Sequence, residues 1–221
     1  NMMQLVNMVA ESPQTDQSGG GNSSLEEYVR SCGCDGMEVI YGGSEDFCRR
    51  NRDSIKGYHL MFYADWLDFW NNDTAALNRK FGSEKVWSGF YGGRGRDSLI
   101  RQLQADLERA ASLDVEYVVF HVSDVSDGEM FTYRWEHTDE EVIDAAARFI
   151  NLLLDGRNYR FEFLMENLHW PGFTFTRPEM TERLLSAVNY RKKGIMLDTG
   201  HLMCTNLDLR DQDDGFRYIH R

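Results

Sequence analysis

The sequence predicts an α/β protein with a parallel β-sheet, and three observations lead to this fold class. Short apolar runs alternate with longer amphipathic segments along the chain, which is typical of repeated strand–helix units. Of the 221 residues, 42% are hydrophobic and 27% are charged, as in an ordinary globular domain. Side chains that bind metals recur where several of the apolar runs end. We therefore expect parallel strands with chemistry at their C-terminal ends.

Six apolar runs have the length and composition of buried strands. They are residues 3–9, 36–41, 55–62, 115–122, 160–166 and 194–197. Residues 11–22 are polar and rich in glycine, which predicts a loop after the first strand. Residues 63–95, rich in Trp, Phe, Asn and Gly, form a connection longer than usual.

Amphipathic segments predict a helix after each strand. The clearest one, residues 96–112, places Leu99, Leu103 and Leu107 at helical spacing. Thr138 and Glu141 have the spacing of a capping box and predict the start of another. The remaining predicted helices are residues 24–31, 45–51, 177–188, with Pro178 in the first turn, and 207–220.

Six successive strand–helix units predict a single domain over residues 1–221 with the fold of a TIM (β/α)8 barrel. Eight units close such a barrel, typically in about 250 residues. We therefore expect about six of the eight units in this chain, with the C-terminal units missing. An open doubly wound sheet is the structural alternative.

The charge balance and the cysteines limit the classes of partner. The formal net charge is −12, from 24 basic and 36 acidic residues, which disfavours nucleic acid as a partner. The apolar runs are too short to span a bilayer and no signal peptide is evident, so we expect a cytoplasmic protein without a membrane partner. The spacing of Cys32, Cys34, Cys48 and Cys204 matches no zinc or redox motif, and we expect reduced thiols.

Four of the six predicted strands end in side chains that bind metals. The third and fourth strands end at His59 and His121, and the fifth ends at Glu166. Asp198 and His201 follow the sixth strand. Each residue alone fits a structural role as well, such as a cap of the turn by Asp198 with His201 as its hydrogen-bond partner. Their recurrence at one end of a parallel barrel instead predicts a shared centre for Zn²⁺ or Mn²⁺, with Mg²⁺ or Co²⁺ as further candidates.

The predicted connections after the strands contain all five tryptophans. Aromatic faces suit the apolar side of a sugar, and they also exclude water from a pocket. Packing of a long connection would explain any single tryptophan. It is a strong alternative for Trp66 and Trp70, which are four residues apart. The five are Trp66, Trp70, Trp87, Trp135 and Trp170.

Residues 164–172, LMENLHWPG, and 194–201, GIMLDTGH, resemble strands five and six of the xylose isomerase-like barrels. This superfamily includes sugar isomerases and epimerases, together with the type-IV apurinic endonucleases (AP endonuclease family 2). The resemblance follows the order of the units along the whole chain. It implies that Glu166 and Asp198 match the first two metal ligands of the superfamily.

The two branches of the superfamily differ in the rest of the ligand set. In the epimerase branch, a His on strand seven and a Glu on strand eight complete it, and the residue matching His201 contacts substrate. In the endonuclease branch, residues matching His59, His121 and His201 also bind metal. The matches at His59 and His121 are therefore closer to the endonuclease pattern, whereas the acidic charge disfavours DNA.

The leading hypothesis is a divalent-metal-dependent isomerase or epimerase of a sugar or sugar phosphate. Glu166 would act as the catalytic base and His201 would orient a substrate oxygen. The alternatives are a zinc phosphodiesterase of the type-IV apurinic endonuclease kind and a non-catalytic barrel that binds small molecules. A homo-oligomer is compatible with the sequence. The predicted contacts to a sugar-like substrate are Asn167, His169, Trp170, Trp66 and Trp135.

Overall fold

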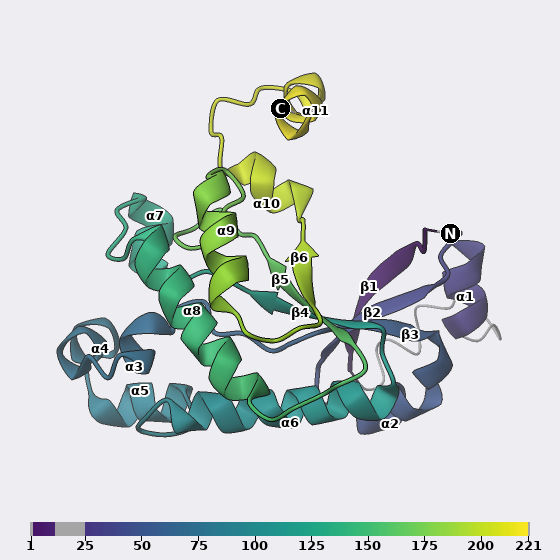
Figure 1. The fold of residues 1–221 in the computed structure, drawn as a ribbon, viewed down its shortest axis with the longest axis horizontal. Helices are drawn as coiled ribbons and strands as arrows, with labels where there is room; N and C mark the ends of the chain where they lie inside the picture. Colours follow the sequence, from purple (N-terminus) through teal and green to yellow (C-terminus); the bar gives the residue numbers. More distant parts are fainter. Residues whose placement is uncertain (1, 12–24, 221) are drawn as a thin grey trace. The chain divides into compact units, whose positions relative to one another are not determined.

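The computed structural model describes residues 2–11 and 25–220 (Figure 1). All six predicted strands are present, and they form one sheet in which neighbours in the sequence are neighbours in space. This is the order of a (β/α) barrel; a doubly wound sheet reverses its strand order. The first four strands pair in parallel. The strands are β1 Leu5–Ala10, β2 Gly36–Tyr41, β3 Ile55–His59, β4 Tyr117–His121, β5 Glu162–Glu166 and β6 Lys193–Met196.

The predicted helices are also present. Helix α8, Asp139–Leu154, begins with the predicted capping box, in which Thr138 Oγ1 accepts the N–H of Glu141 and the Glu141 carboxylate accepts the N–H of Thr138. The others are α1 Leu25–Ser31, α2 Glu45–Arg50, α6 Asp97–Leu113, α9 Pro178–Ala187 and α11 Gln212–Ile219.

Several short helices in the connections were not predicted. A helix of four to eight residues makes about one or two turns, which gives too little periodicity to recognise in a sequence. Residues 12–22 of the predicted glycine-rich loop lie outside the described residues. The additional helices are α3 Leu67–Trp70, α4 Thr74–Phe81, α5 Glu84–Phe90, α7 Asp127–Thr132, α10 Thr199–Cys204 and the 3-10 turn η2 Arg52–Ser54.

The chain divides into two compact units. Within the described residues, no helix has the length and apolar character needed to cross a membrane. The four cysteines are free. The first unit consists of Asn1–Met61, Ala105–Phe120 and Asn158–Leu164, and the second of Phe62–Gln104, His121–Arg157 and Met165–Arg221.

A buried polar contact lies at the centre of the first unit. The hydroxyl of Tyr58, which is fully buried, donates to Asp106. The other oxygen of Asp106 accepts the N–H of Met61. Arg109 bonds both Asp106 and Glu45, so the Asp106 carboxylate is compensated inside the unit. Burial raises the pKa of Tyr58, and the neighbouring Asp106 raises it further.

An aromatic core holds the long connection of the second unit against α8. Trp70 stacks on Phe149 of α8 with ring centroids 4.6 Å apart, and Trp66 packs on the same ring at 5.7 Å. Phe69 stacks on Tyr91 at 4.1 Å. In Figure 1, α8 and α9 lie side by side, and α3 packs against α8. Packing therefore accounts for Trp66 and Trp70.

A network of buried charges also stabilises this connection. Lys80 Nζ lies 3.0 Å from Asp65 Oδ1 and 2.8 Å from Asp68 Oδ2. The other oxygen of Asp68 lies 3.1 Å from His137 Nε2. Burial alone would raise the pKa of Asp68, but the hydrogen bonds from His137 and Lys80 lower it to about 2. Asp124 accepts the backbone N–H groups of two residues in the connection, Trp66 and Leu67.

We expect Gly57→Ala to destabilise the first unit. A Cβ at this position would lie 2.4 Å from Cζ of Tyr117, whose hydroxyl donates to Glu38. Displacing this ring from a packed position should cost about 1–3 kcal/mol in the free energy of unfolding, measured with urea. In the matched control Gly89→Ala, the new Cβ meets no atom within 4 Å, and the change should be neutral or stabilise by up to about 1 kcal/mol. Equal stability of the two variants would contradict this account.

Candidate metal centre and adjoining cavity

Three predicted ligands lie together in the second unit. Glu166 is the last residue of β5, and Asp198 and His201 belong to the turn that starts α10 just after β6. Their ligand atoms all lie within 4.8 Å of one another. His201 Nδ1 is 3.5 Å from Glu166 Oε1 and 3.7 Å from Asp198 Oδ2. The C-terminal ends of β5 and β6 therefore bring two carboxylates and an imidazole to one point.

The N-terminus of α10 places two of these side chains. Asp198 is its N-cap, and Oδ1 accepts the N–H of His201 at 2.6 Å. The structural alternative for this pair, a capped turn, is therefore realised. It uses only one carboxylate oxygen, because Oδ2 lies on the side of the His201 ring. The same turn can thus serve as a cap and present a ligand.

Asn167 fixes the backbone of Asp198 from the neighbouring strand end. Its side-chain oxygen accepts the N–H of Asp198 at 2.8 Å, and its amide nitrogen donates to the carbonyl oxygen of Asp198 at 3.0 Å. The backbone carbonyl of Asn167 lies 2.9 Å from His201 Nδ1. Asn167 is fully buried. One residue therefore positions both ligands that follow β6.

His121 faces the other side of Glu166. It ends β4, and its Nε2 lies 3.2 Å from Glu166 Oε2. Its ring packs on Phe62 with centroids 4.4 Å apart. The two oxygens of Glu166 thus face two different imidazoles. His59 ends β3 in the first unit, where its Nδ1 lies 2.8 Å from Leu60 O, and its role as a ligand stays a prediction.

The donor set fits a divalent cation. Glu166 and Asp198 would repel each other at this separation unless a proton or a cation lay between them. Their oxygens with imidazole nitrogens form the ligand set that Zn²⁺ and Mn²⁺ prefer. The pKa of His201 is raised, chiefly by its hydrogen bond with Glu166 and further by Asp198 and Asn167, against the effect of burial. The site therefore attracts positive charge.

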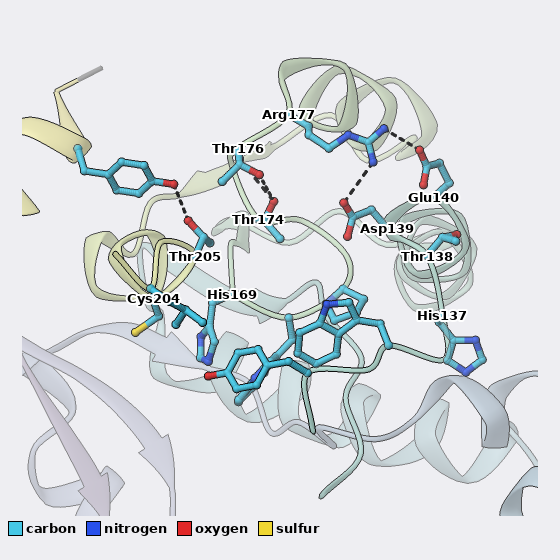
Figure 2. Close-up of a pocket in the computed structure, with 16 residues that line it drawn as sticks. His137, Thr138, Asp139, Glu140, His169, Thr174, Thr176, Arg177, Cys204 and Thr205 are labelled. Atoms are coloured by element: carbon cyan, nitrogen blue, oxygen red, sulfur yellow. Dashed lines mark hydrogen bonds and ion pairs between the residues drawn. The ribbon is translucent and has the colours of Figure 1, made fainter. Parts of the chain in front are cut away.

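A cavity of about 760 Å³ adjoins this centre through His169, and Figure 2 shows the residues that line the cavity. The start of α8, the β5–α9 connection, the end of α10 and α11 line it. His169 belongs to its lining, and the ring of His169 lies 5.9 Å from that of His201. Trp135 and Trp170 line it as well. Three of the five predicted substrate contacts therefore face one cavity beside the centre.

The other two predicted substrate contacts do not line this cavity. The indole N–H of Trp66 donates to Ser123 O at 2.7 Å, and the side chain lies in the aromatic core. The side-chain amide of Asn167 is bonded at both ends to Asp198. Trp66 therefore has a packing role and Asn167 a positioning role, and contact of either residue with substrate stays a prediction.

Several lining residues could not be recognised from the sequence. They are hydroxyl-bearing and charged residues in connections and helices, types that occur on any protein surface, and no spacing marks them as lining a cavity. His137 is also among them, because its partner Asp68 lies 69 residues away in the sequence. The hydroxyl-bearing and charged lining residues that were missed are Tyr133, Thr138, Asp139, Glu140, Thr174, Thr176, Arg177, Thr205 and Tyr218.

We expect Asn167→Ala to weaken metal binding without removing a ligand. The backbone of Asp198 would lose both of its bonds to the Asn167 side chain, and changes to groups that orient ligands typically cost about 10–100-fold in metal affinity. Titration calorimetry with Mn²⁺ measures this. In the control Asn151→Ala, the lost amide joins the backbones of Ala187 and Asn189 in the same way, away from the centre. The control should lose stability but keep its metal affinity; equal metal affinity in both variants would contradict the positioning role.

The fold and the strand-end cluster define the class of protein: six units of a TIM barrel with a candidate metal centre at the C-terminal ends of the strands. Residues 27–221 match the xylose isomerase-like TIM barrel family, and the chain belongs to this family. A comparison with curated proteins finds no match.

Solved structures with the same fold include two sugar-related enzymes and a zinc-bound protein. A D-psicose 3-epimerase in the presence of D-fructose is 15% identical with a TM-score of 0.58, over 98% of this chain and 69% of that one. The mannonate dehydratase from Streptococcus suis serotype 2 is 12% identical with a TM-score of 0.54, over 89% and 63%. The IOLI protein with a bound zinc atom is 17% identical with a TM-score of 0.53, over 93% and 66%. The chain thus spans about two thirds of the length of these proteins, and at such identities the likeness concerns the fold.

Proposed function

We propose that the chain carries the metal centre of a divalent-metal-dependent sugar isomerase or epimerase, with Glu166, Asp198 and His201 as ligands. The observation that carries this proposal is the convergence of these three side chains within 4.8 Å beside a cavity. The zinc bound by the IOLI protein and the sugar-epimerase relative support a metal and a sugar-like substrate. Zn²⁺ and Mn²⁺ suit the donor set best.

Glu166 would remove the proton from the carbon next to the substrate carbonyl. When bound, the cation acts as a Lewis acid toward the carbonyl and hydroxyl oxygens of the substrate. The side chain of Glu166 is 8% exposed, so little water competes for its carboxylate. His121 holds one of its oxygens, and His201 would orient a substrate oxygen.

The cavity would hold the rest of the substrate. Trp135 and Trp170 would stack on the apolar face of a sugar ring or chain. His169, whose pKa is lowered by burial and by the nearby His201, would lie between the cavity and the centre as a neutral imidazole. Lining by aromatic rings and hydroxyl groups suits a polyol.

A zinc phosphodiesterase is the second candidate, and the position of His121 favours it. A carboxylate flanked by two imidazoles, one at each oxygen, is an arrangement that can bridge two metal ions. The net charge of −12 argues against a DNA substrate. Two or more ions per chain would favour this candidate, and one ion would favour the isomerase.

Isotope exchange tests the proposed reaction. The Mn²⁺-loaded protein is incubated in D₂O with a panel of ketoses and aldoses, and NMR follows deuterium at the carbon next to the carbonyl together with new epimers. Glu166→Gln should reduce exchange by about 10²–10⁴-fold. Glu162→Gln, on the exposed side of the same strand, should leave it unchanged. Absence of exchange with every sugar, together with cleavage of a phosphodiester, would establish the second candidate instead.

A further inference from the structure

The arginine at the rim of the cavity is paired with three carboxylates. Arg177 Nη1 lies 3.3 Å from Asp139 Oδ2, Nη2 lies 2.8 Å from Glu140 Oε1, and Nε lies 3.0 Å from Glu179 Oε1. Figure 2 shows the guanidinium turned toward the first two of these carboxylates. Three negative charges thus surround one positive charge, and three of the five N–H groups of the guanidinium already face carboxylates.

Both helices that begin at the cavity have acidic first turns. A helix N-terminus attracts anions through its unpaired N–H groups and its dipole. Helix α8 begins with Asp139, Glu140 and Glu141, and its capping box uses the N–H groups of Thr138 and Glu141. Helix α9 begins with Pro178, which has no N–H, followed by Glu179. A phosphate at either helix start would therefore lie next to carboxylates of the chain.

Another basic group of the lining also faces a carboxylate inside the protein. His137 lines the cavity, and its Nε2 lies 3.1 Å from Asp68 Oδ1. Four of the hydroxyl groups in the lining bond to one another in pairs. Thr174 and Thr176 face each other at 2.7 Å, and Thr205 and Tyr218 do the same at 2.7 Å. Hydroxyl groups of this kind donate and accept, as the hydroxyls of a sugar do.

We propose that this cavity binds the uncharged polyhydroxy part of a substrate and rejects phosphate and carboxylate groups. The inference rests on the proposed function in taking the cavity as the place where the substrate lies. It narrows that function to free sugars and polyols, and excludes sugar phosphates and sugar acids. A dianion at the rim would meet three carboxylates and one guanidinium that is already paired.

Binding of matched ligands tests the proposal. Tryptophan fluorescence of the Mn²⁺-loaded protein is titrated with D-fructose and with its 1-phosphate and 6-phosphate, since Trp135 and Trp170 line the cavity. Like charges brought together cost several kcal/mol, so both phosphates should bind at least about tenfold more weakly than the free sugar. Phosphates that bind as tightly as the free sugar, or no response to any of the three, would overturn the proposal.

A variant that is expected to bind phosphate more tightly distinguishes an effect of charge from a loss of folding. Glu140→Gln with Glu179→Gln leaves Arg177 with one carboxylate, and should raise the affinity for the phosphates relative to that for D-fructose about tenfold. The control Asp144→Asn with Glu182→Gln removes two charges from the same two helices, outside the lining. An unchanged ratio of affinities in the first variant would overturn the role of the rim. These experiments compare binding affinities, so their outcome does not depend on the deuterium exchange that tests the reaction.

Discussion

Glu166→Gln and Asp198→Asn should each lower the affinity for Mn²⁺ or Zn²⁺ by more than about 100-fold. Loss of a group that merely orients a ligand already costs about 10–100-fold, and here a charged donor itself is removed. Titration calorimetry measures the affinity directly. Thermal unfolding provides a second measure, because an ion at 100 times its dissociation constant should stabilise the parent by about 2.7 kcal/mol.

Two neighbouring acidic residues provide matched controls. Glu162 lies on the exposed side of β5, four residues before Glu166, and Asp208 is exposed after α10. Glu162→Gln and Asp208→Asn remove the same charge without changing the donor set, and should retain the parent affinity. If Glu166→Gln or Asp198→Asn also retained it, that residue would not be a ligand.

Lys80→Met should lower the free energy of unfolding by about 3–5 kcal/mol, the largest stability effect that we expect. Lys80 lies between Asp65 and Asp68, and its side chain is 13% exposed. Removing the ammonium group leaves the buried carboxylate of Asp68 and the partly buried carboxylate of Asp65 without this partner. The control Arg79→Met affects a side chain that is 65% exposed and lies 4.0 Å from Glu136, and should change stability by less than about 1 kcal/mol. Urea unfolding measures the free energy of unfolding of both variants, and equal losses would contradict this role of Lys80.

The effect of Lys80→Met should also depend on pH. The pKa of Asp68 lies at about 2 in the folded protein, below its ordinary value, so its contribution to stability is present above pH 4 and is lost as the pH falls toward 2. The deficit of the variant should therefore be largest at neutral pH and become smaller below pH 4. A deficit that is independent of pH would indicate lost packing of the Lys80 stem instead of lost charge pairing.

Much of the fold could be predicted because local patterns determine it. The run 36–41 has the bounds of β2, and the capping box of Thr138 and Glu141 starts α8 as expected. Pro178 stands at the first position of α9. The connection 63–95 could not be predicted in the same way, because its helices are short and the aromatic core and Lys80 fix them through partners distant in the sequence.

The candidate centre was partly predictable for a geometric reason. Parallel strands end at the same side of a sheet, so Glu166 and Asp198 could be expected to meet. The bonds of the Asn167 side chain to the backbone of Asp198 could not be expected, because an amide after a strand has many alternative partners. The paired charges of Arg177 at the cavity rim depend on three carboxylates from two helices, and no sequence spacing reveals them.

Anomalous scattering from crystals grown with Mn²⁺ is the most direct test of the metal centre. We expect a peak at about 2.0–2.2 Å from carboxylate oxygens of Glu166 and Asp198, with an imidazole nitrogen of His201 completing the contact. The absence of a peak there at saturating Mn²⁺, or a peak bound by other residues while these three keep their present contacts, would contradict the account.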